Sequence, residues 1–201
     1  MSAVVVSDVT ELRELISSRM TPAYRTKMLH TVPEWPTVKN RGQYLVELAT
    51  GRQVLDIGCS GPISDAIAAT AKQYRGVDRA LCQGRAMDVV DLDCSPESLQ
   101  VYPEVNLIIC SEVLEHLANP GRFLQALQEK YTGVETCITV PNAGAYSVRD
   151  GYEIVNGDHV AWYSYTTLRV LLERYNYEIL SAFWYNGQPH KAEGLIMLTK
   201  P

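Results

Sequence analysis

The sequence predicts one α/β domain in which a seven-stranded mixed sheet carries helices on both faces. Strand-length apolar runs alternate with segments whose apolar residues recur at helical spacing. The run at 105–110, VNLIIC, is apolar except for Asn106, as expected of a central strand buried on both faces. The chain ends in two strand-like segments joined by a short connection. We therefore expect a parallel core with an antiparallel last strand.

The first 50 residues are expected to form a helical segment ahead of the sheet. Asp8 and Glu11 resemble a capping box at the start of a helix over 8–20. The stretch 21–36 contains three prolines and is expected to be a loop or a broken helix. One side of a second helix comprises Val38, Arg41, Leu45 and Leu48.

The stretch 53–64, QVLDIGCSGPIS, is the one around which the rest of the chain is arranged. An apolar run meets an acid, Asp56, then a tight turn from Gly58 to Gly61, and then a helical pattern. The turn needs small residues because the backbone bends sharply there and a ligand comes close. The helix start offers unpaired N–H groups and a partial positive charge. We therefore expect an anionic or polar ligand group at this turn.

The other strands are expected at 74–78, 87–91, 105–110, 135–140, 177–185 and 194–200. Residues typical of helix starts lie between several of these strands. Asn119-Pro120 and Ser164 each precede a segment with apolar residues on one face. All of these elements fit a single domain spanning 1–201.

VLDIGC at 54–59 resembles the first motif of the class I S-adenosylmethionine-dependent methyltransferases, which usually reads acid-x-Gly-x-Gly-x-Gly. SEVLEHL at 111–117 is a second match, and the resemblance runs from about Arg41 to the C-terminus. It implies a Rossmann-like sheet and S-adenosylmethionine as the cofactor. It also implies that the N-terminal segment, 1–50, covers the cofactor site.

The turn departs from that motif at Ser60 and Pro62, which replace the second and third glycines. Proline has no N–H to donate, so contacts with the methionine end of the cofactor are expected to be fewer or shifted. Two other classes stay open. A nicotinamide-dependent oxidoreductase would have Gly-x-Gly-x-x-Gly, where this turn reads Gly-Cys-Ser-Gly-Pro-Ile. A non-catalytic binding module would keep the fold without an acceptor site.

The resemblance assigns cofactor contacts to the carboxyl ends of the strands. Asp78 lies 20 positions beyond Gly58, where a carboxylate can accept hydrogen bonds from both ribose hydroxyls. Asp91 is expected to accept from the adenine amino group while Leu92 packs on the ring. The full set comprises Asp56, Gly58, Cys59, Ser60, Gly61, Asp78, Arg79, Asp91, Leu92, Ser111 and Glu112.

The acceptor is expected to meet the long segment 143–163, which has little periodicity, as functional loops often do. Asn142, Trp162 and Tyr163 are the expected acceptor contacts. Methyl transfer is one displacement at an activated carbon, so the protein mainly aligns the reactants. A base with a pKa near neutrality helps if the acceptor is a hydroxyl. We expect His159 to be this base, the alternative being a loop histidine that bonds backbone.

A metal site is the alternative use of the same region. Glu112, Glu115 and His116 share one face if a helix begins at Glu112. With His159 they would offer two carboxylates and two imidazoles to a divalent metal. This pattern resembles the metal-dependent methyltransferases that modify the terminal 2′-hydroxyl of small RNAs. Similar segments occur in small-molecule methyltransferases without a metal, where Glu115 and His116 are mostly structural, so we expect no resident metal.

The composition of the chain limits which binding partners and which cellular location we expect. The net charge is −5 and no basic run or RNA-binding extension is present, which argues against a nucleic-acid partner. No Asn/Asp-Pro-Pro-aromatic motif of amino-methylating DNA enzymes occurs. No apolar run reaches the length of a membrane span, and the first residues do not resemble a secretory signal. The five cysteines are odd in number and widely spaced, which fits neither a disulfide framework nor a zinc site. We expect reduced thiols, a cytoplasmic protein and a small metabolite or sugar as acceptor.

Overall fold

The computed structural model describes residues 36–82, 84–143, 148–149, 152–153, 157–187 and 192–201. The chain divides between Pro33 and Glu34, and every described residue belongs to the second unit, Glu34–Pro201. The helix expected at 8–20 and most of the loop expected at 21–36 lie outside the described residues. The placement of the N-terminal segment over the cofactor therefore stays a prediction.

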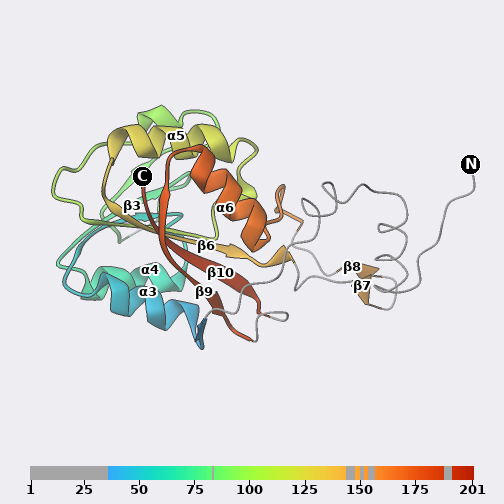
Figure 1. Ribbon diagram of the computed structural model, residues 1–201. Helices are drawn as coiled ribbons and strands as arrows, with labels where there is room; N and C mark the ends of the chain where they lie inside the picture. The colour runs from blue at the N-terminus through green and yellow to red at the C-terminus, as the bar shows by residue number, and fades with distance from the viewer. Residues whose placement is uncertain (1–35, 83, 144–147, 150–151, 154–156, 188–191) are drawn as a thin grey trace, which may run out of the picture. The chain divides into compact units, whose positions relative to one another are not determined.

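A mixed sheet of eight strands forms the centre of this unit (Figure 1). In spatial order the strands are β1 (Thr37–Val38), β9 (Glu178–Tyr185), β10 (Gly194–Lys200), β6 (Glu135–Pro141), β5 (Leu107–Ser111), β2 (Gln53–Ile57), β3 (Gln73–Asp78) and β4 (Met87–Val89). Strands β2 to β6 pair in parallel. Strand β10 runs antiparallel to both β6 and β9. The α/β class, the parallel core and the antiparallel last strand are confirmed. A separate two-stranded sheet consists of β7 (Val148–Arg149) and β8 (Tyr152–Glu153).

The eighth strand, β1, corrects the predicted number of seven. Val38 was expected on one side of a helix, but Thr37 and Val38 pair in parallel with Trp184 and Tyr185. Helix α3 (Arg41–Ala49) begins only after Asn40, whose side chain accepts a hydrogen bond from the Gln43 amide. The helical prediction for Val38 is wrong because this cap starts the helix later than the apolar spacing indicates.

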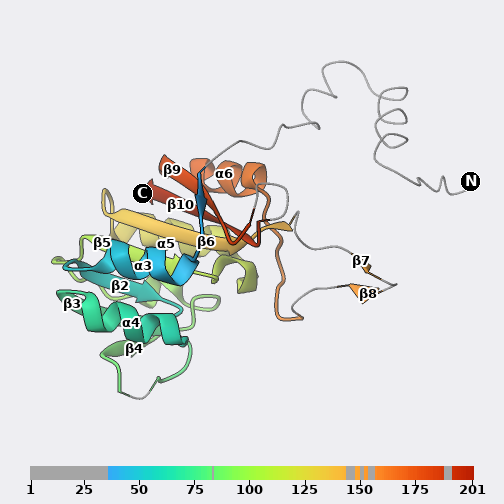
Figure 2. The same ribbon diagram turned by 90° about the horizontal axis from the view of Figure 1, so that it is seen from below.

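Helices cover both faces of the sheet, as predicted (Figure 2). Helices α3 and α4 (Pro62–Thr70) lie on one face, where Leu45 and Ile67 are buried with the sheet residues beneath them. Helices α5 (Pro120–Lys130) and α6 (Tyr165–Arg174) lie on the other, with Phe123 and Leu168 fully buried. Two further single turns are η1 (Pro96–Ser98) and η2 (Leu114–His116). None of the helices in the described ranges is long and apolar enough to span a bilayer.

The connection between β3 and β4 is unusually short for two parallel strands. Residues 79–86 make the crossover, and none of those that the structure describes is helical. Parallel strands usually need a dozen or more residues, commonly including a helix. The short path keeps Cys82 and Arg85 close to the turn that follows β2.

Candidate active site

The glycine turn after β2 has no room for a side chain at its first position. Gly58 has φ +80°, and its amide donates to the Val77 carbonyl of β3 over 2.8 Å. A Cβ atom there would overlap Cγ2 of Val113, which follows β5. Glycine is therefore required by both backbone and space, and the turn packs directly against the segment that leads to Glu115.

Arg85 fixes the same turn from the β3–β4 connection. Its guanidinium donates to the carbonyls of Cys59 and Gly61 and pairs with Asp65 in the first turn of α4, with 2.7 Å between Nη2 and Oδ1. Gly61 caps α4 and Pro62 is its first residue. No pattern in the sequence indicates this role for Arg85, because the fold is what brings the two carbonyls and Asp65 to its guanidinium.

Asp56 supports the turn from within the sheet. Its carboxylate accepts from the Tyr74 hydroxyl over 2.9 Å and from Ser64. It is 2% exposed, and burial raises its pKa to about 6. The predicted contact between Asp56 and the cofactor stays a prediction, since the side chain is engaged with its own neighbours.

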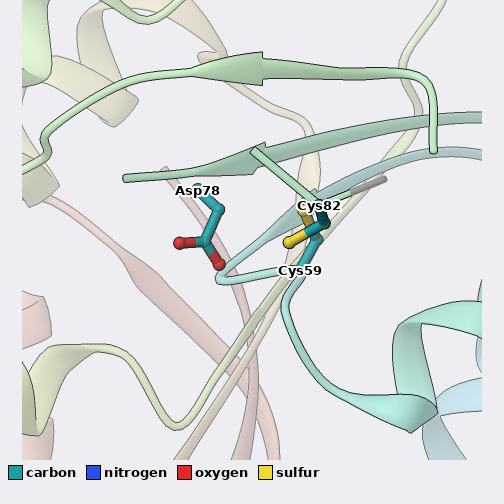
Figure 3. A group of neighbouring side chains, drawn as sticks. All are labelled: Cys59, Asp78 and Cys82. Carbon is teal, nitrogen blue, oxygen red and sulfur yellow. The ribbon is translucent and has the colours of Figure 1, made fainter. Parts of the chain in front are cut away.

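Asp78 stands at the end of β3, beside the glycine turn, as the topology predicted (Figure 3). Its carboxylate lies within 4.8 Å of the Cys59 and Cys82 sulfurs. Around Gly61, by contrast, a Cβ atom would meet no other atom within 4 Å. The space at Gly61 fits the methionine end of the expected cofactor, and the partly exposed carboxylate of Asp78 fits its ribose hydroxyls.

The predicted adenine contacts have other neighbours. Oδ1 of Asp91 accepts from the amides of Asp93 and Cys94, which lowers the pKa of Asp91, and the charge of Arg79 lowers it further. Leu92 is 7% exposed and packs in the core. Only a small part of the Leu92 side chain is left for an adenine ring. The adenine contacts of Asp91 and Leu92 and the cofactor contact of Arg79 stay predictions.

Glu112 follows β5 in a left-handed conformation, with φ +56°. Its Oε1 accepts from the Thr139 and Tyr185 hydroxyls at 2.9 and 3.1 Å and pairs with Arg41 at 2.8 Å. Ser111 Oγ also bonds the Thr139 hydroxyl, at 2.9 Å. No helix begins at Glu112, since η2 starts only at Leu114. The condition under which Glu112 would share a helical face with Glu115 and His116 is therefore not met.

Glu115, His116 and His159 do come together. One ligand atom from each lies within 4.8 Å of the others, and the two imidazole centroids are 4.8 Å apart. Glu115 is 1% exposed, and among the described residues neither of its carboxylate oxygens has a hydrogen-bond partner. Burial, and then the charge of Glu112, raises the pKa of Glu115 to about 8. The amides of Val160 and Ala161 donate to the Glu115 carbonyl, which fixes the loop carrying His159 against η2.

The surroundings of His159 favour its neutral imidazole form. Burial and the neighbouring His116 lower its pKa, and its buried Nδ1 has no hydrogen-bond partner in the part of the chain that the structure describes. His116 instead bonds the Asp158 carbonyl through Nδ1, at 3.1 Å. The ring of Trp162 lies 5.2 Å from that of His159. A neutral imidazole is the form that accepts a proton.

The three predicted acceptor residues differ in exposure. Asn142 is 5% exposed and donates to the Ala192 carbonyl over 3.0 Å. Tyr163 is 6% exposed, its hydroxyl donates to the Leu114 carbonyl over 3.3 Å, and burial raises its pKa to about 12. Trp162 is 36% exposed beside His159. Trp162 is therefore the one of the three that offers a substantial surface to an acceptor.

Comparison with known families identifies the class of protein. A family model described as a methyltransferase domain matches residues 28–182. The chain therefore belongs to this methyltransferase family, and the resemblance to the class I S-adenosylmethionine-dependent methyltransferases is confirmed. S-adenosylmethionine is the cofactor of this family, which agrees with the open turn and the neighbouring carboxylate.

Part of the chain is similar in sequence to a curated protein. An alignment 139 positions long, at 28% identity, relates it to a ubiquinone biosynthesis O-methyltransferase of Aeromonas salmonicida (strain A449) and covers 60% of this chain and 56% of that protein. The chain thus spans little more than half the length of this curated relative.

Two solved structures show the same fold at low identity. The small RNA methyltransferase HEN1 superposes with a TM-score of 0.63 at 16% identity, over 96% of this chain and 30% of HEN1. A Burkholderia thailandensis 1,6-didemethyltoxoflavin-N1-methyltransferase, solved with S-adenosylhomocysteine, superposes with 0.58 at 14% identity, over 99% of this chain and 92% of that one.

Proposed function

We propose that this chain transfers a methyl group from S-adenosylmethionine to a hydroxyl group of a small metabolite or sugar, with His159 as the base. The observation that carries the proposal is the placement of His159. Its loop is bonded to Glu115, which follows Val113, and Val113 packs against Gly58 of the cofactor turn. A neutral imidazole is thereby connected, through few residues, to the turn where this family binds its methyl donor. The O-methyltransferase activity named for the curated relative supports a hydroxyl acceptor.

Residues at the carboxyl ends of the strands each contact a different part of the cofactor. When bound, S-adenosylmethionine supplies a methyl group on a positively charged sulfur that leaves as a neutral thioether. Gly58 to Gly61, with Cys59 and Ser60 between them, face its methionine end at the start of α4. Asp78 accepts from the ribose hydroxyls, and Asp91 from the adenine amino group. Ser111 and Glu112 line the reaction side, where Arg41 balances the charge of Glu112.

His159 receives the proton that the acceptor hydroxyl loses as its oxygen attacks. Its lowered pKa keeps the ring unprotonated at neutral pH, ready for this step. Glu115 is mainly protonated at neutral pH because its pKa is raised to about 8. Once His159 is charged, ionised Glu115 and the imidazolium stabilise each other, so the two protonation equilibria are coupled. Trp162 supplies an apolar surface beside the base.

The experiment is transfer of an isotopically labelled methyl group from S-adenosylmethionine to a panel of phenols, catechols, sugars and amines, with EDTA present. We expect label on hydroxyl acceptors, and loss of transfer in His159→Gln with binding of S-adenosylhomocysteine retained. Labelling of amines only would contradict the hydroxyl assignment. Binding of the cofactor without any transfer, across a broad panel, would favour the non-catalytic module.

A second candidate function is metal-assisted methylation of an RNA 2′-hydroxyl. The specific observation in its favour is Glu115. Among the described residues its carboxylate oxygens have no hydrogen-bond partner, and one of them lies within 4.8 Å of a ring nitrogen of His116 and of His159. A divalent cation would satisfy these groups without a hydrogen bond. The fourth expected ligand, Glu112, is bonded to Arg41, Thr139 and Tyr185 instead. Loss of transfer in EDTA, recovery with Mn²⁺ and a preference for RNA over small hydroxyl compounds would replace the first proposal with this one.

We also propose a cytoplasmic location. The five cysteines are all free thiols in the structure, which supports a reducing compartment. Cell fractionation with a tagged full-length protein tests this directly.

A further inference from the structure

A second group of ligand atoms lies on the opposite side of the carboxyl edge from Glu115. Cys59 comes from the glycine turn, Asp78 from the end of β3 and Cys82 from the connection that follows (Figure 3). One ligand atom from each lies within 4.8 Å of the others. Their spacing along the chain predicts no such group, because the short β3–β4 connection is what folds Cys82 back over the turn.

These three side chains are suited to a borderline-soft divalent cation. Zinc is bound by cysteine sulfur at about 2.3 Å and by carboxylate oxygen at about 2.0–2.2 Å, so two ligands of one ion stand roughly 3.5–4 Å apart. Separations within 4.8 Å need only small side-chain rotations to reach that geometry. A third sulfur is adjacent, since the Cys82 amide donates to Met87 Sδ over 3.0 Å.

The surroundings of Cys59 carry negative charge. Its thiol is fully buried, and burial together with the carboxylates of Asp56 and Asp78 raises its pKa to about 12. The same field attracts a divalent cation, and a coordinated thiol loses its proton to solvent. The nearby cation Arg85 is engaged by Asp65 and by the carbonyls of Cys59 and Gly61.

We propose that Cys59, Cys82 and Asp78 form a binding site for Zn²⁺ or a cation of similar softness, and that this cation and the ribose of S-adenosylmethionine exclude each other. Binding replaces two thiol protons with two metal–sulfur bonds, and water completes the coordination. Exclusion rests on the proposed function, because it requires Asp78 to be the ribose contact. The metal site itself does not depend on that role.

The test of the site is titration of the reduced protein with Cd²⁺, read by the ultraviolet thiolate-to-metal band, and with Zn²⁺, read by competition with a chromophoric chelator. We expect one thiolate-bound ion per chain, and at least tenfold weaker binding in Cys82→Ser and in Asp78→Asn. Cys94→Ser is the matched control, since Cys94 is an exposed cysteine outside the group. The thiolate band separates this site from the imidazoles of the Glu115 group. Equal Cd²⁺ bands in wild type and Cys82→Ser would overturn the proposal.

The test of exclusion is the affinity for S-adenosylhomocysteine with and without saturating Zn²⁺. We expect at least a tenfold loss of affinity in the wild type, and none in Cys82→Ser. A metal that binds without weakening S-adenosylhomocysteine overturns the exclusion and leaves the site intact. If the metal-free protein binds no S-adenosylhomocysteine, the proposed function fails while the metal titration still decides the site.

Discussion

The two sides of the sheet's carboxyl edge differ in how fully their polar groups are bonded. On the glycine-turn side, Asp56 is bonded by Tyr74 and Ser64, and Arg85 bonds the turn carbonyls. On the β5 side, the two carboxylate oxygens of the buried Glu115 and Nδ1 of His159 have no hydrogen-bond partner within the described ranges. Unbonded buried polar groups cost folding free energy, so they are expected where chemistry needs them. We infer that the glycine-turn side holds a ligand in one position and that the β5 side changes protonation.

The largest expected effect is on the rate of methyl transfer, in the variant His159→Gln on the β5 side. Losing a general base lowers kcat by on the order of 100-fold or more. In the wild type, kcat/KM should rise with pH through an apparent pKa below the ordinary histidine value of 6.5, because the base must be unprotonated and its pKa is lowered. Initial rates from pH 5 to 9 measure both quantities.

His116→Gln is the matched control for this prediction. The base hypothesis predicts a much smaller loss than in His159→Gln, whereas the metal hypothesis predicts equal, severe losses in both. Unchanged kcat in His159→Gln would contradict a catalytic role for this residue.

The next test concerns the glycine-turn side, in the variant Gly58→Ala. Alanine disfavours φ +80° and its Cβ would overlap Val113, so we expect a loss of about 3 kcal/mol in the free energy of unfolding. Gly51→Ala is the control, since Gly51 has φ +72° and an added Cβ there would meet no other atom within 4 Å. It should lose only about 1 kcal/mol, the backbone part. Equal losses in urea unfolding would show that packing against Val113 is unimportant.

A smaller effect compares the two acids of the β5 side. The pKa of Glu115 is raised from 4.5 to about 8 in the folded protein, so its ionisation costs nothing below pH 4.5 and progressively destabilises the fold up to about pH 8. Glu115→Gln should therefore be more stable than the wild type by on the order of 2 kcal/mol at pH 9, and equal to it near pH 4.5.

Glu112→Gln should behave in the opposite way. It weakens the ion pair with Arg41 and should lower stability by about 1 kcal/mol at neutral pH. Thermal unfolding of both variants across the pH range separates the two acids. A wild type that loses no stability relative to Glu115→Gln as pH rises would show that Glu115 is solvated or paired.

The sequence predicted the elements whose signals are local. Strand β2, the glycine turn and α4 follow from an apolar run, small residues and Pro62 in succession, and Asp78 follows from its place at the end of β3. The buried run in β5 predicted a central strand in the same way. These signals do not depend on distant contacts.

The sequence failed where distant partners decide the outcome. Glu112 has a left-handed backbone and binds Arg41 and Tyr185, which come from α3 and β9, so the helix on which its alignment with Glu115 and His116 depended does not form there. Val38 forms a strand because β9 offers it an edge. Arg85 and the grouping of Cys59 with Cys82 depend on the short β3–β4 connection, which periodicity does not reveal.

The central claim is that the glycine turn and Asp78 together bind the sulfur nucleoside. Calorimetric titration of the metal-free protein with S-adenosylhomocysteine tests it most directly, in the wild type and in Asp78→Asn. Glu178→Gln is the control, because Glu178 is an exposed acid at the start of β9. We predict one site per chain, at least tenfold weaker binding in Asp78→Asn, about 1.4 kcal/mol, and unchanged binding in Glu178→Gln. An Asp78→Asn protein that binds as tightly as the wild type would contradict the account.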